Sequence, residues 1–223
     1  MTGIKIDKII RSKRKTIALI VNQDATLIVK APQHTSMDYI NDLVQKKRSW
    51  IIAKQAQIRL RPSYHPKEFV NGESFRFLGK DYRLEIVTDD KDQIYIQEKI
   101  LIPSYMLPEA QKHLIKWYKQ KALERISERI QRYSIIAGFK PLSVKITDAQ
   151  KRWGSCGHNG TLNFSWRLVL APLNIIDYVV VHELIHLQEK NHSSRFKNKL
   201  RTIMPDFERR ERWLKENGHL LKL

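Results

Sequence analysis

The stretch DYVVVHELIHLQEKNHSSRF, residues 177–196, combines an apolar run with three histidines and two glutamates. Its apolar residues fall at helical spacing and predict a buried helix, with Asn174 as N-cap and Asp177 as the third helical position. Burying an unpartnered imidazole or carboxylate in such a helix costs about 2–7 kcal/mol or more. The histidines are therefore either core or surface residues satisfied by neighbours, or ligands of a metal ion, and the burial cost favours the metal.

The pattern His-Glu-x-x-His, abbreviated HExxH, occupies residues 182–186. Side chains four residues apart lie on one face of a helix, so His182 and His186 can converge on a single ion. Glu183 projects alongside that ion, which is the position of a general base that acts on metal-activated water. The pattern therefore predicts one catalytic zinc ion per chain, with these two histidines as ligands and Glu183 as the base.

A catalytic zinc ion normally has three protein ligands, so a third ligand is expected. His192 stands at the offset of the third histidine in the metzincin pattern, but Glu189 replaces the glycine of that pattern. We expect the helix to continue past Glu189 and the chain to turn near residues 190–191, because asparagine tolerates the left-handed conformation that ends helices. The alternative third ligand is a glutamate on a later helix, and the candidates are Glu208 and Glu211.

The first 103 residues alternate short apolar runs with turn residues, which is typical of strands. Strands are predicted within residues 15–21, 25–31, 73–87, 93–97 and 99–103, the first two forming a hairpin and the third run folding back at Gly79. Ser36 is expected to cap one helix that carries apolar residues from Ile40 to Ile58 and ends at Pro62. This part is therefore predicted to be mostly antiparallel sheet with one helix.

Helices are expected to dominate the rest of the chain. A long amphipathic helix is predicted over residues 108–137 and ends at Gly138. A pair of strands is expected within 142–149 and 161–170, and helices over 193–202 and 206–216 follow the histidine helix. The sequence thus predicts an α+β protein with a β-rich domain over residues 1–103 and a catalytic domain over residues 104–223.

Composition limits the class of protein. The 223 residues are 42% hydrophobic and 29% charged, as in globular proteins. No run of about 18 apolar residues occurs, so no membrane span is expected, and the N-terminal residues lack the apolar core of a signal peptide. The single cysteine, Cys156, has no partner for an internal disulfide, which makes the cytoplasm the simplest location.

The net charge of +18 is large for this length. Such a field attracts polyanions, so nucleic acid or another polyanion is a candidate partner. The basic residues cluster at 11–15, 46–48, 151–152 and 209–212. A solvated basic surface that keeps the protein soluble accounts for the charge equally well, and both interpretations stay open.

Four motifs together resemble one family. RWGSC at 152–156, NFSWRL at 163–168, HELIH at 182–186 and NHSSRF at 191–196 follow one another as in the YgjP-like metal-dependent hydrolases. That family is related to the SprT-like and Wss1-like zinc metalloproteases. The N-terminal RSKRKTIALIV is also similar, although less specifically, so the resemblance covers nearly the whole chain. It implies a zincin-like catalytic part with a short edge-strand sheet, zinc on His182, His186 and His192, and Glu183 as general base.

The resemblance also implies a substrate-binding edge. In zincin proteases an edge strand above the metal pairs with an extended substrate, and residues 151–157 or 161–166 are the candidates for that strand here. The expected substrate-binding residues are Arg152, Trp153, Gly154, Ser155 and Asn163. A purely structural turn explains the same residues, with glycines for backbone shape and the tryptophan for packing.

These features support a zinc metallopeptidase as the first hypothesis, acting on a peptide or protein. The alternative is a nucleoside triphosphate pyrophosphatase of the UTP type that uses the same metal site, an activity that the family resemblance also implies. A third hypothesis is a non-enzymatic, nucleic-acid-associated protein with a structural zinc ion, which Glu183 disfavours because a structural site needs no base. The oxyanion-stabilising residue is open among Arg152, Arg167, Tyr178 and His219.

Overall fold

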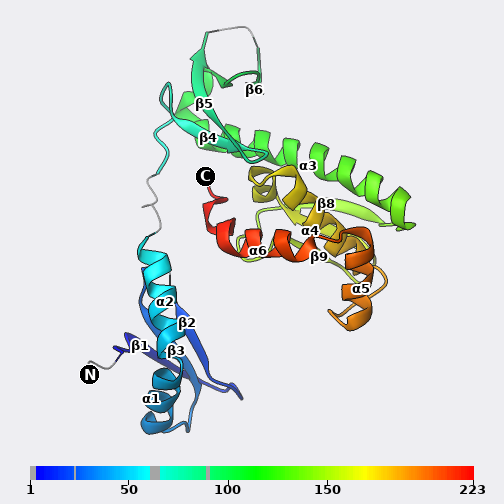
Figure 1. Ribbon diagram of the computed structural model, residues 1–223. Helices are drawn as coiled ribbons and strands as arrows, with labels where there is room; N and C mark the ends of the chain where they lie inside the picture. Colours follow the sequence, from blue (N-terminus) through cyan, green and yellow to red (C-terminus); the bar gives the residue numbers. More distant parts are fainter. Residues whose placement is uncertain (1–3, 23, 61–65, 89–90) are drawn as a thin grey trace. The chain divides into compact units, whose positions relative to one another are not determined.

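The computed structural model describes residues 4–22, 24–60, 66–88 and 91–223, and it confirms an α+β fold (Figure 1). The chain separates into two compact units, residues 1–65 and 66–223, which are described in turn. The division into domains at residue 103 stays a prediction. Among the described residues, no helix combines the length and the apolarity that crossing a membrane requires.

The first unit is a three-stranded sheet with two helices on one face. Its strands are β1 (Lys8–Ser12), β2 (Ala18–Val21) and β3 (Leu27–Pro32), in the order β1-β3-β2. The pairing of β2 with β3 is antiparallel, which confirms the predicted hairpin, and β1 runs parallel to β3. The core consists of apolar residues from β3 and the helices: Leu27, Val29, Ala31, Ile40, Val44 and Ile51.

The single helix predicted for this unit is in fact two helices, α1 (Met37–Lys46) and α2 (Arg48–Arg59). Ser36 caps α1 as predicted, because its side chain accepts a hydrogen bond from the Tyr39 N–H. Lys47 interrupts the helix with φ −101° and ψ 12°. The apolar stripe continues across Lys47 at helical spacing, so the sequence does not reveal the break. Pro62, the predicted helix end, lies outside the described residues.

The second unit begins with a four-stranded sheet in the order β4-β5-β7-β6. The strands are β4 (Ser74–Phe77), β5 (Lys80–Val87), β6 (Tyr95–Ile96) and β7 (Ile100–Pro103). The β4–β5 hairpin turns at Gly79 as predicted, whereas β5 and β7 are parallel, so the sheet is mixed. Gly79 has φ +79°, and a Cβ there would lie 2.7 Å from Pro172 Cγ, so the hairpin tip abuts the start of the histidine helix.

The histidine helix is one of several helices in the second unit. They are the short η1 (Ser104–Glu109), the long α3 (Ala110–Ala137), α4 (Leu173–Ile185), α5 (Ser194–Ile203), α6 (Phe207–Asn217) and the short η3 (Gly218–Leu220). The long helix ends at Gly138 in the left-handed conformation, as predicted. The helix α4 carries the HExxH pattern and lies against α3 on one side and α6 on the other (Figure 1).

A second small sheet lies beside α4 and has the order β8-β10-β9. Its strands are β8 (Ser143–Thr147), β9 (Gly154–Cys156) and β10 (Thr161–Ser165), followed by the short helix η2 (Trp166–Leu170). The predicted strand over 161–170 therefore ends at Ser165. Residues 154–156 form an edge strand antiparallel to β10, within the candidate edge strand over residues 151–157, for which a purely structural turn was the alternative.

The start of α4 differs from the expectation. Pro172 is its N-cap and makes no side-chain capping bond, so Asn174 lies inside the helix. Asp177 does not complement the first turn either. Its carboxylate accepts two hydrogen bonds from Arg129 of α3, at 2.5 and 3.0 Å, and both residues are buried. This buried ion pair joins α4 to α3.

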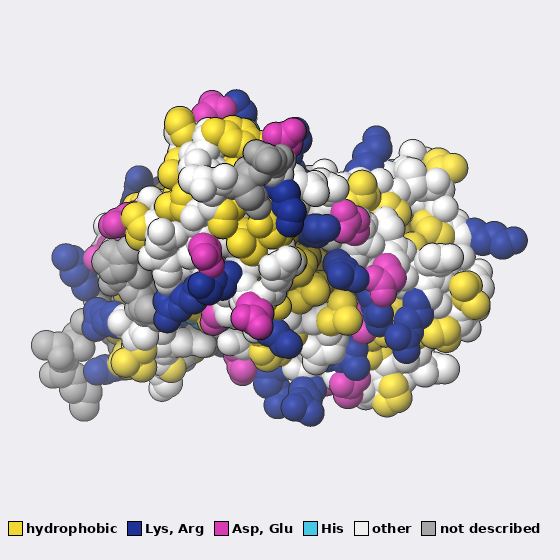
Figure 2. All heavy atoms as spheres, turned by 90° about the horizontal axis from the view of Figure 1, so that it is seen from above, with side chains coloured by type: hydrophobic (Ala, Val, Ile, Leu, Met, Phe, Trp, Pro, Cys, Tyr) yellow, Lys and Arg dark blue, Asp and Glu magenta, His cyan; other side chains and the backbone are white. Residues whose placement is uncertain are grey.

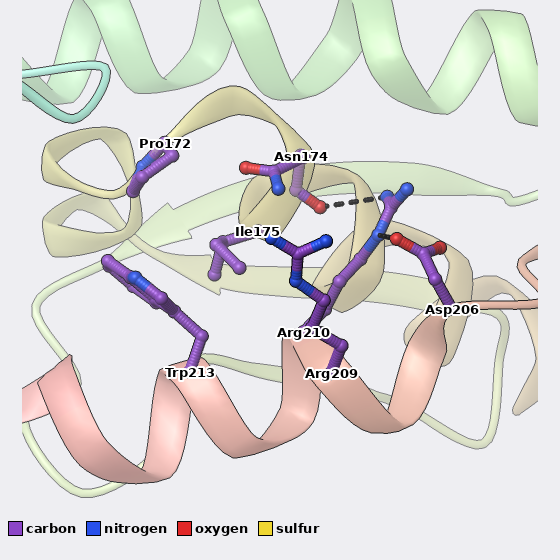
Figure 3. A pocket seen from close by; sticks show the side chains of 7 residues that line it. All are labelled: Pro172, Asn174, Ile175, Asp206, Arg209, Arg210 and Trp213. Atoms are coloured by element: carbon purple, nitrogen blue, oxygen red, sulfur yellow. Dashed lines mark hydrogen bonds and ion pairs between the residues drawn. The ribbon is translucent and has the colours of Figure 1, made fainter.

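The opposite side of this first turn meets α6. There a surface pocket is lined by Pro172, Asn174 and Ile175 on one side and by Asp206, Arg209, Arg210 and Trp213 on the other (Figure 3). Arg210 spans the two helices, because it donates to the Asn174 backbone carbonyl at 3.0 Å and pairs with Asp206 at 2.9 Å. The pocket lies at the first turn of α4, whereas the histidines lie at the last.

Candidate metal centre

Three histidine rings meet at the end of α4. His182 and His186 come from the helix, and His192 comes from the segment between α4 and α5, with ring centroids 4.8–4.9 Å apart in every pair. One ring nitrogen from each histidine lies within 4.8 Å of the others. The Nε2 atoms of His182 and His192 are 3.0 Å apart. The structure thus brings together the three residues predicted as zinc ligands.

The turn that delivers His192 differs from the expected one. The helix ends at Ile185 with His186 as its C-cap, whereas continuation past Glu189 was predicted. The chain turns over residues 186–188, and the His186 Nδ1 atom lies 2.8 Å from the Glu189 carbonyl oxygen. That hydrogen bond orients the His186 ring with Nε2 toward the other histidines. The helix therefore ends at the turn that follows His186, and this turn contains no glycine.

The ring of Phe196 supports the triad. Its centroid lies 4.9 Å from that of His182 and 4.8 Å from those of His186 and His192, and the side chain is only 2% exposed. Ser193 caps α5 by accepting a hydrogen bond from the Phe196 N–H at 3.4 Å. Sequence reasoning missed this role. Phe196 lies in the first turn of α5, four residues after His192.

The glutamates considered as alternative third ligands are engaged elsewhere. Glu208 pairs with Arg201 at 2.7 Å, and Glu211 pairs with Lys215 at 2.8 Å. Neither belongs to the cluster of metal-ligating atoms found among the described residues, which consists of the three histidines alone. The arrangement therefore favours His192 over both glutamates.

The chemistry of this donor set fits a divalent ion. Burial, reinforced by His186 and His192, lowers the pKa of His182 to about 3, and burial also lowers the pKa of His186. These rings are therefore neutral near pH 7, which is the form that binds a metal. The Nε2 atom of His182 faces the triad, whereas its Nδ1 atom is buried and has no hydrogen-bond partner among the described residues. Three convergent imidazoles match a catalytic zinc set.

Glu183 lies beside the triad and is 6% exposed. Its burial raises its pKa to about 7, against a smaller opposing effect of the positive charge of Arg152. The edge strand β9 approaches this carboxyl group closely. A Cβ at Gly154 would lie 2.6 Å from Glu183 Cγ and 2.7 Å from its Oε1, so only glycine fits there without displacement. The close approach of Glu183 therefore explains why the RWGSC motif has a glycine at position 154.

The other expected substrate-binding residues surround this contact. Ser155 of β9 pairs with Asn163 of β10 in the sheet register. Arg152 is exposed, just before the strand. The Trp153 ring packs against Gly218, where a Cβ would lie 2.9 Å from it, and its carbonyl accepts from the Ser165 N–H. Arg152 therefore has access to solvent near the base, while Trp153 fixes β9 to the C-terminal segment.

The four candidates for an oxyanion-stabilising residue differ in their surroundings. Arg167 is held by Asp148 at 2.7 Å, away from the triad. Tyr178 packs edge-on against His182 at 5.8 Å, and its pKa is raised by burial and then by the charges of Glu211 and Glu183. His219 lies in η3. Of the four candidates, Arg152 lowers the pKa of Glu183, and the charge of Glu183 raises the pKa of Tyr178. These two residues therefore interact electrostatically with the proposed base.

Some solved structures and one family model are similar to parts of this chain. Abylysin of Pyrococcus abyssi, a metallopeptidase zymogen, is similar at 18% identity and TM-score 0.38, over 41% of this chain and 93% of that chain. The jannalysin zymogen of Methanocaldococcus jannaschii is similar at 24% identity and TM-score 0.38, over 43% and 96%. No curated protein matches. The YgjP-like metallopeptidase domain matches residues 15–217, which confirms the resemblance drawn from the motifs, and the chain therefore belongs to the YgjP-like family.

Proposed function

We propose that the protein is a zinc metallopeptidase with one zinc ion on His182, His186 and His192. The observation that carries this proposal is the juxtaposition of three elements: a convergent triad of imidazoles, a buried carboxyl group beside it, and an edge strand in contact with that carboxyl group. A structural zinc site is usually closed by four protein ligands and has no use for an adjacent base. Three ligands with a base are typical of hydrolytic zinc.

The bound zinc would supply Lewis acidity that activates a water molecule for attack on a carbonyl carbon. Glu183 would accept the proton of that water and deliver it to the leaving amine. In the protein without metal, burial raises the pKa of Glu183 to about 7, and the positive charge of a bound zinc ion would act in the opposite direction. The burial of Glu183 keeps the carboxyl group positioned and shields it from bulk water.

The edge strand supplies a way to bind an extended peptide. In the sheet order β8-β10-β9, one side of β9 pairs with β10 and the other lies at the sheet edge. Backbone groups at an edge can pair with an added strand, as in other proteins that bind peptides by β-augmentation. Because Gly154 places this edge against Glu183, a peptide bound there would lie next to the base.

The test compares hydrolysis by the zinc-loaded protein and by Glu183→Gln, with Glu189→Gln as the matched control in the same segment. Mixed peptides and nucleoside triphosphates are assayed side by side, and zinc content is measured for each variant. We expect peptide hydrolysis by the native protein and Glu189→Gln, a loss of at least about 100-fold in Glu183→Gln, and equal zinc in all three. Hydrolysis of triphosphates but not peptides would overturn the peptidase proposal.

A further inference from the structure

The first unit carries positive charge with little compensation. Its described residues, 4–22 and 24–60, include twelve Lys and Arg but four Asp and no Glu. Only one of these cations forms an ion pair with a described residue: Lys5 Nζ lies 4.0 Å from Asp7 Oδ1. The basic charge of this unit is therefore available to a partner.

The second unit is different, because its cations are frequently matched. Lys99 pairs with Glu85 at 2.8 Å, and Lys121 with Glu124 at 2.8 Å. Across the whole molecule, the face that Figure 2 displays carries Lys and Arg side chains together with Asp and Glu side chains. Ion pairs with described residues therefore involve a smaller share of the cations in the first unit than in the second, although both units hold unmatched cations.

The alternation along β3 shows which side of the first sheet is uncovered. Leu27, Val29 and Ala31 are buried under the helices, whereas Ile28 is partly buried and Lys30 is exposed. Since successive side chains of a strand point to opposite faces, Ile28 and Lys30 lie on the face away from the helices. No apolar residue of this face packs against the described core of the unit.

Strand register extends this face across the sheet. Lys8 of β1 and Ile20 of β2 stand opposite Ile28, and Ile10 of β1 stands opposite Lys30. We call the group Lys8, Ile10, Ile20, Ile28 and Lys30 the outer sheet face. Its isoleucines are partly buried, and both of its lysines are exposed.

The connection between β1 and β2 adds two more cations at one end of this face. Ser12, the last residue of β1, stands opposite Pro32 in the next row of the same face. Lys13 and Lys15 follow directly, and both are exposed. Four exposed lysines therefore border a flat aliphatic surface that holds no carboxylate.

We propose that the outer sheet face, with Lys13 and Lys15, binds a nucleic-acid strand. The phosphodiester backbone is a continuous line of negative charge, which matches lysines spread along a surface. The isoleucine side chains between them are partly exposed and can make van der Waals contacts with bases and sugars of a strand whose phosphates the lysines bind. A membrane surface is a poorer match, because membrane-binding surfaces insert protruding apolar side chains, and these isoleucines are partly buried.

The experiment uses the full-length protein and fluorescence anisotropy with labelled single-stranded DNA, single-stranded RNA of the same sequence, and a DNA duplex. The test variant replaces four cations of the proposed site: Lys8→Gln, Lys13→Gln, Lys15→Gln and Lys30→Gln. The matched control replaces four exposed lysines of the second unit: Lys116→Gln, Lys119→Gln, Lys140→Gln and Lys145→Gln. Both variants change the net charge equally. Thermal unfolding and zinc content show whether each variant is folded. If the fourfold test variant is unfolded, the single variants Lys8→Gln and Lys30→Gln replace it in the binding assay.

We expect the native protein to bind at least one of the three nucleic acids. Comparing DNA with RNA shows which sugar it prefers, and comparing single-stranded with duplex DNA shows whether it prefers one strand or two. The fourfold test variant should weaken binding by at least about tenfold and reduce the slope of log K against log salt by about 3 for a single strand. The control should change the Kd by less than about threefold. An equal loss in the control would show that only diffuse charge acts and would overturn the proposed site. Binding to phosphatidylserine vesicles without binding to nucleic acid would overturn it as well.

Discussion

The backbone of Gly154 lies directly against the carboxyl group of Glu183, so a β-carbon there would stand 2.7 Å from the nearer carboxylate oxygen. This contact joins two motifs that are nearly thirty residues apart in the sequence. The edge strand that Gly154 begins is thereby held beside the proposed general base. A substitution at either residue should therefore displace the other.

Gly154→Ala tests this contact. The added methyl group must displace Glu183 or the edge strand, and a displacement of about 1 Å at a catalytic group can lower the rate roughly 100-fold. We expect kcat/KM for peptide hydrolysis to fall by about that factor while zinc content is unchanged. The control is Gly157→Ala, where the nearest atoms to the added carbon would be the Asn159 side-chain oxygen at 3.0 Å and the Thr161 carbonyl oxygen at 3.4 Å. Similar rates for both variants would show that the contact is unimportant.

Phe196→Leu tests the support of the triad. The smaller side chain cannot contact all three rings, so the histidines lose part of their orientation before the metal binds. Residues that orient metal ligands typically change metal affinity by about 10–100-fold, and we expect a loss in that range for zinc. Phe207→Leu is the control, because Phe207 is also buried but has no ring contact with the histidines. Zinc affinity is measured by competition with a chelating dye, and equal losses in both variants would rule out a specific role.

The raised pKa of Glu183 predicts a pH-dependent stability in the metal-free protein. Folding raises this pKa from 4.5 to about 7, so the folded protein binds the proton more tightly than the unfolded chain. The stability associated with Glu183 is therefore highest at low pH and declines as pH rises from 4.5 to 7, by about 3 kcal/mol in total.

Glu183→Gln removes this titration and leaves the histidines in place. With metal removed, the free energy of unfolding of the variant relative to native protein should increase by about 3 kcal/mol between pH 4.5 and 8. Urea unfolding at several pH values measures the difference. A difference that stays constant over this range would show that Glu183 has an ordinary pKa.

Arg129→Met tests the buried ion pair between α3 and α4. Removing one partner leaves the Asp177 carboxylate buried without its counter-charge, which typically costs about 3–5 kcal/mol. Arg125→Met, one turn earlier on the same helix, breaks only an exposed pair with Glu128 and should cost less than about 1 kcal/mol. Urea unfolding of both variants gives the two values, and equal values would mean that Asp177 does not depend on Arg129.

Much of the site follows from local sequence rules. The HExxH spacing and the apolar run around it predict the histidine helix and its shared face, because both depend only on helical periodicity. The hairpin over residues 18–32, the turn at Gly79 and the helix end at Gly138 depend on short-range turn chemistry in the same way.

The remainder depends on contacts between distant residues. Residues 154–156 form a strand only because β10 is beside them, and the glycine requirement at Gly154 comes from Glu183 on another element. The early end of α4 reflects a hydrogen bond from the His186 ring to the Glu189 carbonyl, which no residue spacing predicts. Asp177 was assigned to the first turn of its own helix because Arg129 is 48 residues away.

The central claim is that His182, His186 and His192 hold one zinc ion at a site open to water. X-ray absorption at the zinc edge of the purified protein tests it most directly, because it counts the imidazoles bound to the metal. We predict three imidazole nitrogens at about 2.0–2.1 Å plus one oxygen donor, no sulfur, and two imidazoles in His192→Ala. Four protein ligands including sulfur, or an unchanged imidazole count in His192→Ala, would contradict the account.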